Sequence, residues 1–281
     1  MPGLILEGGA MRAVYTAGVL DALLDQKAHF NYVVGVSAGI TNGYSYVSGQ
    51  RGRNWEVMRR YRRSPRYMSV MNYPRCGSLF GLDFIYGEVP NRLVPYDYDA
   101  LGRYEGTVLT GVTNALTGRI EYYDQSYVEA NNILLRASCA VPYMFPSIPF
   151  NGGGYYDGGL SDPIPIRKAL VDGHKKNLIV LTRELGYQKT SDRSTELSTR
   201  AMQRKYPSLA RIMRDRHLVY NGLLEMVERL ESAGDAIVLR PAAEVNVGRL
   251  EKNIGRLESL YKAGYRDAFE KQEAIAGLFA T

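Results

Sequence analysis

Short runs of apolar residues alternate along the chain with longer segments in which apolar residues recur every three or four positions. The runs at 3–6, 32–37, 107–113, 177–182 and 236–240 predict buried strands. Helical spacing continues to about residue 24, from 40 to 48, to about residue 173, from 208 to 231 and from 256 to 279. This alternation predicts an α/β fold with a doubly wound, mostly parallel sheet and helices on both faces.

The segments between these elements predict smaller features. They are a short strand at 120–123, a helix at 124–138 that begins at an Asp-Gln-Ser cap, and a hairpin at 147–156. Asp162 followed by Pro163 is typical of a helix N-terminus, and the polar residues 191–199 predict a surface loop. Residues 72–98 predict an irregular apolar cap, which either lines a pocket or belongs to the core.

Nothing in the composition divides the 281 residues, because no Pro/Gly/Ser-rich linker or repeat interrupts them. We therefore expect one domain over 1–281, in which 183–281 forms a helical C-terminal extension packed on the rest. The start of the chain has no signal-peptide pattern, and no apolar run approaches a membrane span. Cys76 and Cys139 lack partners at metal-ligand spacing, which predicts free thiols and a cytoplasmic location.

The chain is mildly basic, with a formal net charge of +6. Residues 51–75 hold eight arginines against one glutamate, interleaved with tyrosines, methionines and a tryptophan. One interpretation is a patch that contacts anionic membrane peripherally. The other is a solvated helix face whose apolar side packs on the core. No nucleic-acid motif accompanies the basic charge, so no nucleic-acid partner is predicted.

The strand at 32–37 ends in Gly35-Val36-Ser37-Ala38-Gly39 and opens into a helix. This pattern is typical of a nucleophile elbow, in which glycines without Cβ atoms let strand and helix approach and expose Ser37 at the apex. The helix N-terminus beside Ser37 favours a developing negative charge. An ordinary strand-to-helix turn is the alternative interpretation.

A glycine-rich turn, Glu7-Gly8-Gly9-Ala10-Met11-Arg12, follows the first strand. Successive backbone N–H groups in such a turn can bind a phosphate or the oxyanion of an acyl-transfer intermediate. The turn lacks the glycine spacing of a dinucleotide site and the Gly-Lys-Ser/Thr of a P-loop, so a nucleotide cofactor is not expected. Arg12 either contacts an anion or holds the turn in place.

An attacking serine needs a base, and the three histidines are poorly placed for that role. His174 lies in a helix-to-strand turn, which in a parallel sheet is at the end opposite the elbow. His29 precedes a strand, and His217 lies in a basic helical segment with Arg214 and Arg216, where a solvated role is expected. These positions argue against a Ser-His-Asp triad.

Asp157 is the better base, because it leaves a predicted strand directly onto Gly158 and Gly159 and has an exposed carboxylate there. A plain Asp-Gly turn is its structural alternative. A Ser37–Asp157 dyad is therefore the catalytic arrangement that the sequence favours.

Four stretches, in this order and spacing, resemble the patatin-like phospholipase family and its bacterial cytoplasmic members. They are Glu7–Arg12, Gly35–Gly39, Arg136-Ala137-Ser138-Cys139-Ala140-Val141-Pro142 and Asp157–Gly159, within a resemblance that covers about 3–182. The resemblance implies a three-layer α/β domain that hydrolyses acyl esters of lipids, as phospholipases A and lysophospholipases do, through a Ser-Asp dyad without metal or cofactor.

Carried onto these positions, the resemblance implies that Ser37 attacks the ester and that Asp157 takes its proton and later activates water. The N–H groups of Gly8, Gly9 and Ala10 would hold the oxyanion, and Arg12 would brace the turn. Ala10 and Ala13 stand where the family usually has glycine, so a positive φ at Ala10 would cost about 1 kcal/mol.

An aspartate that deprotonates a serine must be partly desolvated, which raises its pKa. Tyr155, Tyr156 and the apolar loop at 143–145 are expected to supply that shielding. Three other functions stay open: a catalytically silent lipid-binding or regulatory protein, a broad carboxylesterase for small soluble esters, and a phosphate- or nucleotide-binding protein.

Overall fold

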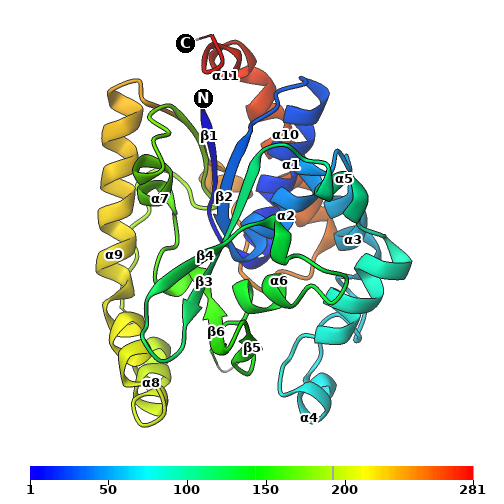
Figure 1. The fold of residues 1–281 in the computed structure, drawn as a ribbon, viewed down its shortest axis with the longest axis vertical. Helices are drawn as coiled ribbons and strands as arrows, with labels where there is room; N and C mark the ends of the chain where they lie inside the picture. The colour runs from blue at the N-terminus through cyan, green and yellow to red at the C-terminus, as the bar shows by residue number, and fades with distance from the viewer. Residues whose placement is uncertain (143, 192, 281) are drawn as a thin grey trace.

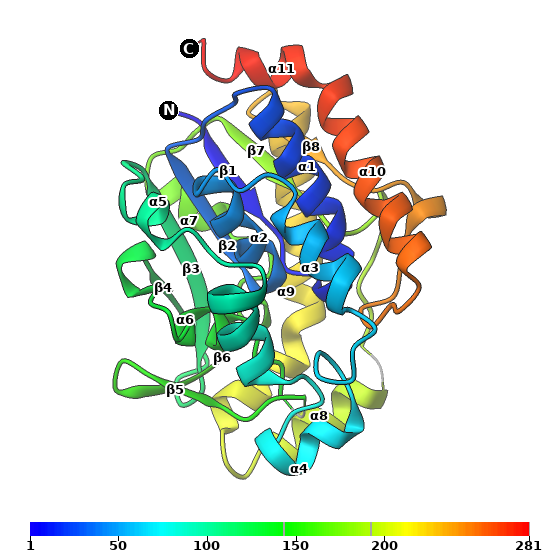
Figure 2. The same ribbon diagram turned by 90° about the vertical axis from the view of Figure 1, so that its right-hand side faces the viewer.

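The computed structural model of the chain describes residues 1–142, 144–191 and 193–280. Within these residues, one sheet holds eight strands in the order β5-β6-β3-β2-β1-β7-β8, with β4 paired to β3. Helices cover both faces of this sheet (Figures 1 and 2), which confirms the predicted doubly wound α/β fold.

The strands lie where the apolar runs predict them. They are β1 Gly3–Leu6, β2 Tyr32–Val36, β3 Thr107–Asn114, β4 Ile120–Tyr123, β5 Ile148–Phe150, β6 Gly153–Asp157, β7 Asn177–Val180 and β8 Ala236–Leu239. The neighbours β3, β2, β1, β7 and β8 are parallel. The strands β4 and β6 run antiparallel to β3, and β5 runs antiparallel to β6. The carboxyl ends of β1, β2 and β7 therefore share one edge of the sheet.

Eleven α-helical segments are described, together with short 3-10 turns and one π-helix over Phe84–Leu93. The helices are α1 Val14–Asp25, α2 Ser37–Val47, α3 Arg53–Tyr61, α4 Tyr73–Cys76, α5 Tyr98–Gly102, α6 Ile133–Ser138, α7 Ile166–Val171, α8 Arg193–Met202, α9 Pro207–Ser232, α10 Ile254–Glu270 and α11 Gln272–Gly277.

The two faces of the sheet have separate cores. Leu4 and Leu6 point to the face covered by α1, α2 and α10, whereas Ile5 points to the face covered by α7 and α9. This alternation follows from the two-residue period of a strand. Residues after 183 thus contribute a strand and helices on both faces.

Four local predictions are wrong. The predicted helix at 124–138 is only α6, because Asn132 takes a left-handed conformation (φ 49°) and the helix begins after it. Asp162 does not cap α7, which begins at Ile166; its carboxylate instead accepts a hydrogen bond from the Tyr122 hydroxyl at 2.6 Å.

The other two concern the C-terminal part. Most of the predicted loop at 191–199 belongs to α8, and residue 192 of that loop lies outside the described residues. The predicted helix at 256–279 is divided into α10 and α11 near Lys271. Among the described residues, no helix combines the length and apolar composition that a bilayer crossing requires. Cys76 and Cys139 are free thiols.

Candidate active site

Ser37 stands at the turn from β2 into α2 with a φ of 54°, a left-handed conformation that a non-glycine residue rarely adopts. Ser37 is 7% exposed, so it is buried against the cavity and not exposed at the apex as the sequence predicts. A Cβ on Gly39 would lie 2.4 Å from the Glu7 carbonyl oxygen, and one on Gly35 would lie 2.9 Å from Leu6 Cβ. Only glycine lets the elbow pack this closely on β1, so the turn has the geometry of a nucleophile elbow.

The elbow is held by a side chain from α6. The Ser37 N–H donates to Ser138 Oγ at 2.8 Å, and the Ser138 hydroxyl donates to the Gly111 carbonyl on β3 at 2.8 Å. Ser138 therefore ties the strained turn to the neighbouring strand.

Asp157 ends β6 as predicted, but it is 7% exposed and therefore buried, whereas the sequence predicts an exposed carboxylate. The Gly159 N–H donates to its Oδ1 at 2.7 Å, and a Cβ on Gly158 would lie 2.3 Å from the Gly111 carbonyl oxygen. Burial raises the pKa of Asp157 above the usual aspartate range, although Ser37, the Gly159 N–H and Arg216 each act to lower that pKa. A carboxyl group poised in this way is suited to act as a base nearer neutral pH.

Ser37 and Asp157 face the same cavity, and the serine side chain lowers the pKa of the carboxylate. This effect of Ser37 opposes the larger effect of burial on the Asp157 pKa. In enzymes that pair a nucleophile with a base, the contact between the two commonly tightens when substrate binds.

The glycine-rich turn lies against the elbow. A Cβ on Gly8 would be 2.9 Å from Ser37 Cβ, which places the Gly8 backbone beside the serine. Ala10 has a φ of 50°, which is the strained, positive φ considered in the sequence analysis. Among the described residues, no protein group accepts a hydrogen bond from the N–H of Gly8, Gly9 or Ala10. These N–H groups are available to an oxyanion.

Three hydrogen bonds hold this turn, two of them to the buried Glu7 carboxylate. Glu7 is 1% exposed, and its carboxylate accepts hydrogen bonds from the Tyr220 hydroxyl at 2.7 Å and the Thr182 N–H at 2.5 Å. The Met11 N–H donates to the Arg249 carbonyl at 3.3 Å. Both Tyr220 and Arg249 belong to the C-terminal part of the chain.

Arg12, Arg216 and Arg249 all line the same cavity. The Nε of buried Arg12 has no hydrogen-bond partner among the described residues. Sequence reasoning missed Arg216, because it placed the 214–217 segment in solvent. The Arg216 Nε instead donates to the Gly159 carbonyl at 2.7 Å. The helical spacing indicates that Arg216 faces the interior, because position 216 lies on the same face of α9 as the buried residues Met213, Tyr220 and Leu223.

The cavity has a volume of about 420 Å³, within the range of small-molecule sites, and most of its walls are apolar. Its walls include Trp55, Met58, Phe80, Tyr86 and Phe145. Cys139 also lines it, and burial raises the pKa of its thiol to about 11. The thiol is therefore protonated near neutral pH and is a poor nucleophile.

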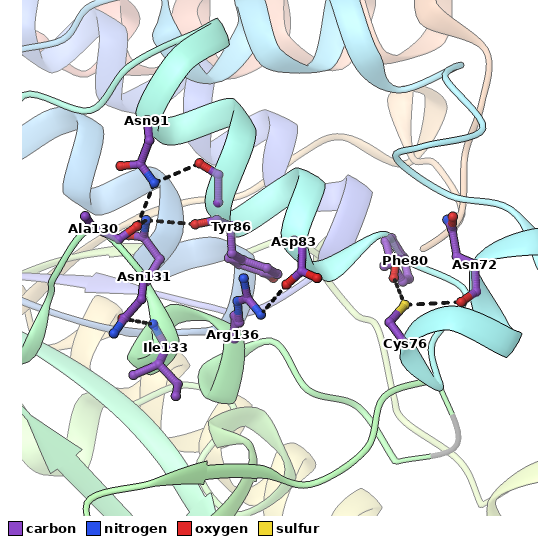
Figure 3. A network of polar contacts seen from close by, with 12 residues as sticks. Asn72, Cys76, Phe80, Asp83, Tyr86, Asn91, Ala130, Asn131, Ile133 and Arg136 are labelled. Atoms are coloured by element: carbon purple, nitrogen blue, oxygen red, sulfur yellow. Dashed lines mark hydrogen bonds and ion pairs between the residues drawn. The ribbon is translucent and has the colours of Figure 1, made fainter.

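The predicted apolar cap at 72–98 lines this cavity through Phe80, Ile85 and Tyr86. Figure 3 shows how polar contacts fasten it to the segment around α6: Arg136 pairs with Asp83 at 2.9 Å, and Asn91 Nδ2 donates to the Ala130 carbonyl at 2.7 Å. Inside the cap, the Cys76 thiol donates to the Asn72 and Phe80 carbonyls.

The arginines of 51–75 are not one solvated face. Arg62 is 1% exposed and donates to the Leu250 carbonyl at 2.7 Å, and the Arg53 guanidinium lies 3.4 Å from the Tyr96 ring centroid. Arg51, Arg60 and Arg66 pair with carboxylates. The apolar side of α3 does pack on the core.

His174 and His217 have contacts other than Ser37 and Asp157. His174 precedes β7, at the amino edge of the parallel strands, and stacks on Tyr32 with ring centroids 3.9 Å apart. The His217 ring contacts the Arg214 carbonyl one turn back. Among the described residues, no group of three or more His, Cys, Asp and Glu side chains is arranged to hold a metal ion.

The expected shielding of Asp157 is only partly visible. Met144 and Phe145 line the cavity that contains the carboxylate, whereas Tyr143 lies outside the described residues. The Tyr155 hydroxyl donates to Glu121 at 2.7 Å, so its polar end is engaged elsewhere.

The chain is therefore an α/β protein in which a nucleophile elbow, a glycine-rich turn and a buried aspartate line one cavity. A model of the patatin-like phospholipase family matches residues 4–170, more than half of the chain. The chain belongs to that family. A second model, a domain of unknown function (DUF6363), matches residues 206–279.

The uncharacterized protein YjjU of Escherichia coli (strain K12) is 29% identical over 185 residues, which cover 64% of this chain and 51% of YjjU. Lysophospholipase NTE1 of Yarrowia lipolytica is 27% identical over 185 residues, which cover 61% of this chain and 12% of NTE1. The chain thus spans about half of YjjU and a small part of NTE1. The crystal structure of VipD from Legionella pneumophila superposes with a TM-score of 0.49 at 15% identity, covering 97% of this chain and 66% of VipD.

Proposed function

We propose that this protein is a serine acyl hydrolase of phospholipase A or lysophospholipase type, which cleaves carboxylic esters of lipids through Ser37 and Asp157. The observation that carries the proposal is one apolar cavity lined by a serine at φ 54°, a buried aspartate and backbone N–H groups that have no acceptor among the described residues. Membership of the patatin-like phospholipase family and the likeness to a lysophospholipase support a lipid ester as substrate.

The reaction has two steps. Asp157 takes the proton of Ser37 as the Ser37 Oγ attacks the ester carbonyl carbon, and the N–H groups of Gly8, Gly9 and Ala10 stabilise the oxyanion. The intermediate collapses to an acyl-enzyme as the alcohol leaves with the proton that Asp157 returns. Asp157 then takes a proton from water as the water oxygen attacks the acyl-enzyme carbonyl. The second intermediate collapses as Asp157 returns that proton to Ser37 Oγ, which releases the fatty acid and restores the Ser37 hydroxyl and the Asp157 carboxylate.

The apolar walls are suited to hold the acyl chain. Phe80, Phe145 and Met58 offer no hydrogen bonds, so chain burial supplies the binding free energy, roughly 0.8 kcal/mol for each buried CH₂. A small soluble ester would leave most of this cavity unfilled. Longer chains are therefore expected to give the higher kcat/KM.

The direct test is hydrolysis of p-nitrophenyl esters from acetate to palmitate. Wild type should prefer the longer chains, and Ser37→Ala and Asp157→Ala should both lose hydrolysis. Ser232→Ala and Asp99→Asn, which alter exposed positions outside the cavity, are the matched controls. Preference for acetate would favour a small-ester carboxylesterase. Wild type without hydrolysis and without reaction at Ser37 would favour a lipid-binding protein.

We further propose that the protein docks peripherally on anionic membrane through the tip around α4, which lies at the end of the molecule opposite the chain termini (Figure 1). Val70, Met71 and Tyr73 are 73%, 72% and 51% exposed there, with Arg63 and Arg75 exposed nearby. Apolar side chains flanked by arginines suit the headgroup region of a bilayer. The tip adjoins the cavity wall, because Met68 bridges to Phe80.

Vesicle flotation tests this docking. Phosphatidylglycerol vesicles should bind the protein more than phosphatidylcholine vesicles do, and Met71→Glu should reduce that binding. Val171→Glu is the control, since Val171 is 83% exposed but precedes β7 at the amino edge of the sheet. Equal loss in both variants, or equal binding to both lipids, would contradict the proposed tip.

A further inference from the structure

Three arginines are among the residues that line the cavity, and the third of them, Arg249, is an exposed residue; Asp157 is the single acidic residue among the described lining residues. Arg12 comes from the turn after β1, Arg216 from α9 and Arg249 from the loop before α10. None of the three has a carboxylate oxygen within 4.0 Å among the described residues. The polar end of an otherwise apolar cavity therefore carries excess positive charge.

The arginines are also near enough to repel one another. Burial is the largest effect on both Arg12 and Arg216 and lowers the pKa of Arg12 to about 10. Arg249 acts to lower both pKa values further, whereas the Glu7 carboxylate acts to raise them. Arg12 is 8% exposed, yet its Nε has no partner among the described residues. A buried donor without an acceptor is costly, and an anionic group of a ligand would supply the missing acceptor.

We infer that Arg12, Arg216 and Arg249 form an anion subsite that binds the phosphate of a phospholipid substrate while its acyl chain occupies the apolar end. This inference rests on the proposed function. Guanidinium groups bind phosphate oxygens through paired, charge-assisted hydrogen bonds. The subsite makes the C-terminal part of the chain a determinant of specificity, because it supplies two of the three cations.

Two features place the phosphate close to the ester. Arg216 donates to the Gly159 carbonyl, and Gly159 in turn donates to Asp157. The Arg249 carbonyl accepts from Met11, directly after the N–H groups proposed for the oxyanion. The subsite is thus attached to both loops of the proposed reaction centre, as the short spacing between ester and phosphate in a lysophospholipid requires.

The test compares two substrates that share an acyl chain, octanoyl-lysophosphatidylglycerol and monooctanoylglycerol. Arg249→Gln should lower the ratio of their kcat/KM values roughly 10- to 100-fold, the effect of losing a hydrogen bond between charged groups. Arg216→Gln should lower the same ratio. Arg103→Gln removes an exposed cation near the start of β3, at the opposite edge of the sheet, and should leave the ratio within about twofold.

A binding measurement separates this inference from the proposed hydrolysis. Calorimetry of Ser37→Ala with octanoyl-lysophosphatidylglycerol should show binding that Arg249→Gln weakens roughly tenfold. Binding and ratio both unchanged by Arg249→Gln and Arg216→Gln would overturn the subsite, whatever the hydrolysis assay gives. Inorganic phosphate that binds Ser37→Ala as tightly as the lysophospholipid would overturn the assignment to a lipid headgroup.

Discussion

Residues 4–170 and 206–279 build one cavity in different ways. The first region contributes backbone geometry at the ends of strands, in the elbow at Ser37, the turn at Gly8–Ala10 and the Asp157–Gly159 loop. The second contributes long polar side chains from a distance, such as Arg216 and Tyr220 on α9. The groups that react are thus placed by local chain geometry, whereas long-range packing sets the charge around them.

This difference also explains how α9 acts on both loops. Arg216 and Tyr220 are four residues apart and therefore share one face of the helix. Arg216 contacts the loop of Asp157, and Tyr220 contacts Glu7 before the glycine-rich turn. A shift of α9 would disturb both loops together.

The largest expected effect comes from the first region. Asp157→Asn should lower hydrolysis roughly 10²- to 10⁴-fold, because the proposed base is lost. The same variant should be more stable to urea than wild type at neutral pH. Burial raises the folded-state pKa of Asp157, so the folded protein holds the proton more tightly than the unfolded chain. The contribution of Asp157 to the free energy of unfolding therefore falls as the pH rises through its raised pKa.

Asp99→Asn, at an exposed carboxylate, should change neither property. The stability gain of Asp157→Asn should grow from acidic to neutral pH. A gain that is constant with pH, or a loss at neutral pH, would show that the Asp157 carboxylate is not held in an unfavourable environment.

The contact between the two regions gives the next effect. A Cβ on Gly264 of α10 would lie 2.1 Å from the Tyr15 carbonyl oxygen on α1. Gly264→Ala should therefore lower the free energy of unfolding by about 3 kcal/mol through overpacking. The sole tryptophan reports on the same region, because Trp55 stacks on Tyr261 of α10 with ring centroids 5.4 Å apart. Circular dichroism and tryptophan fluorescence should show one shared, shifted transition.

Gly222→Ala on α9 is the matched glycine variant, since a Cβ there meets nothing within 4 Å. It should raise stability by about 0.5–1 kcal/mol, as alanine does inside a helix. Separate transitions by the two probes would contradict our proposal that 1–281 is one domain with 183–281 packed on it.

A smaller effect is expected at the link from α9 to the glycine-rich turn. Tyr220→Phe removes a hydrogen bond to the buried Glu7 carboxylate, which should cost about 2 kcal/mol of stability. The proposed oxyanion turn would then be less well held, so kcat should fall more than KM changes. Tyr187→Phe is the control, because its ring packs edge-on to Tyr220 at 5.9 Å. Equal effects of both variants would assign the role to packing alone.

The smallest effect concerns Ala10. Ala10→Gly should relieve the positive φ, but glycine also has more freedom in the unfolded chain, so the net gain should stay below about 1 kcal/mol. Ala13 has a φ of −69°, and Ala13→Gly should lower stability by about 0.5–1 kcal/mol. Thermal unfolding of both variants therefore compares glycine at a positive φ, at position 10, with glycine at a negative φ, at position 13. A loss at Ala10 matching that at Ala13 would contradict the strain.

The sequence predicts most of the sheet and the elbow, because both depend on neighbouring residues. The strands β1, β2, β3, β7 and β8 follow apolar runs, and the elbow follows from glycines on either side of Ser37. The hairpin is predicted for the same reason, since Asn151 and Gly152 both take positive φ values. Local patterns suffice where local geometry decides.

The rest depends on partners that are remote in sequence. The sequence at Asp162 is typical of a helix cap, but its carboxylate accepts a hydrogen bond from the Tyr122 hydroxyl on β4. The basic segment around Arg216 predicts a solvated side chain, but the Arg216 Nε donates a hydrogen bond to the Gly159 carbonyl. Neither partner can be identified from neighbouring residues, and the cationic end of the cavity is missed for that reason.

The most direct test of the central proposal is labelling with a fluorophosphonate that carries an octyl chain, followed by peptide mass spectrometry. We expect one label per chain, located on Ser37, with none on Ser37→Ala. Labelling of Asp157→Asn should be much slower and that of Asp99→Asn unchanged. A label on another residue, or full-rate labelling of Asp157→Asn, would contradict the Ser37–Asp157 dyad.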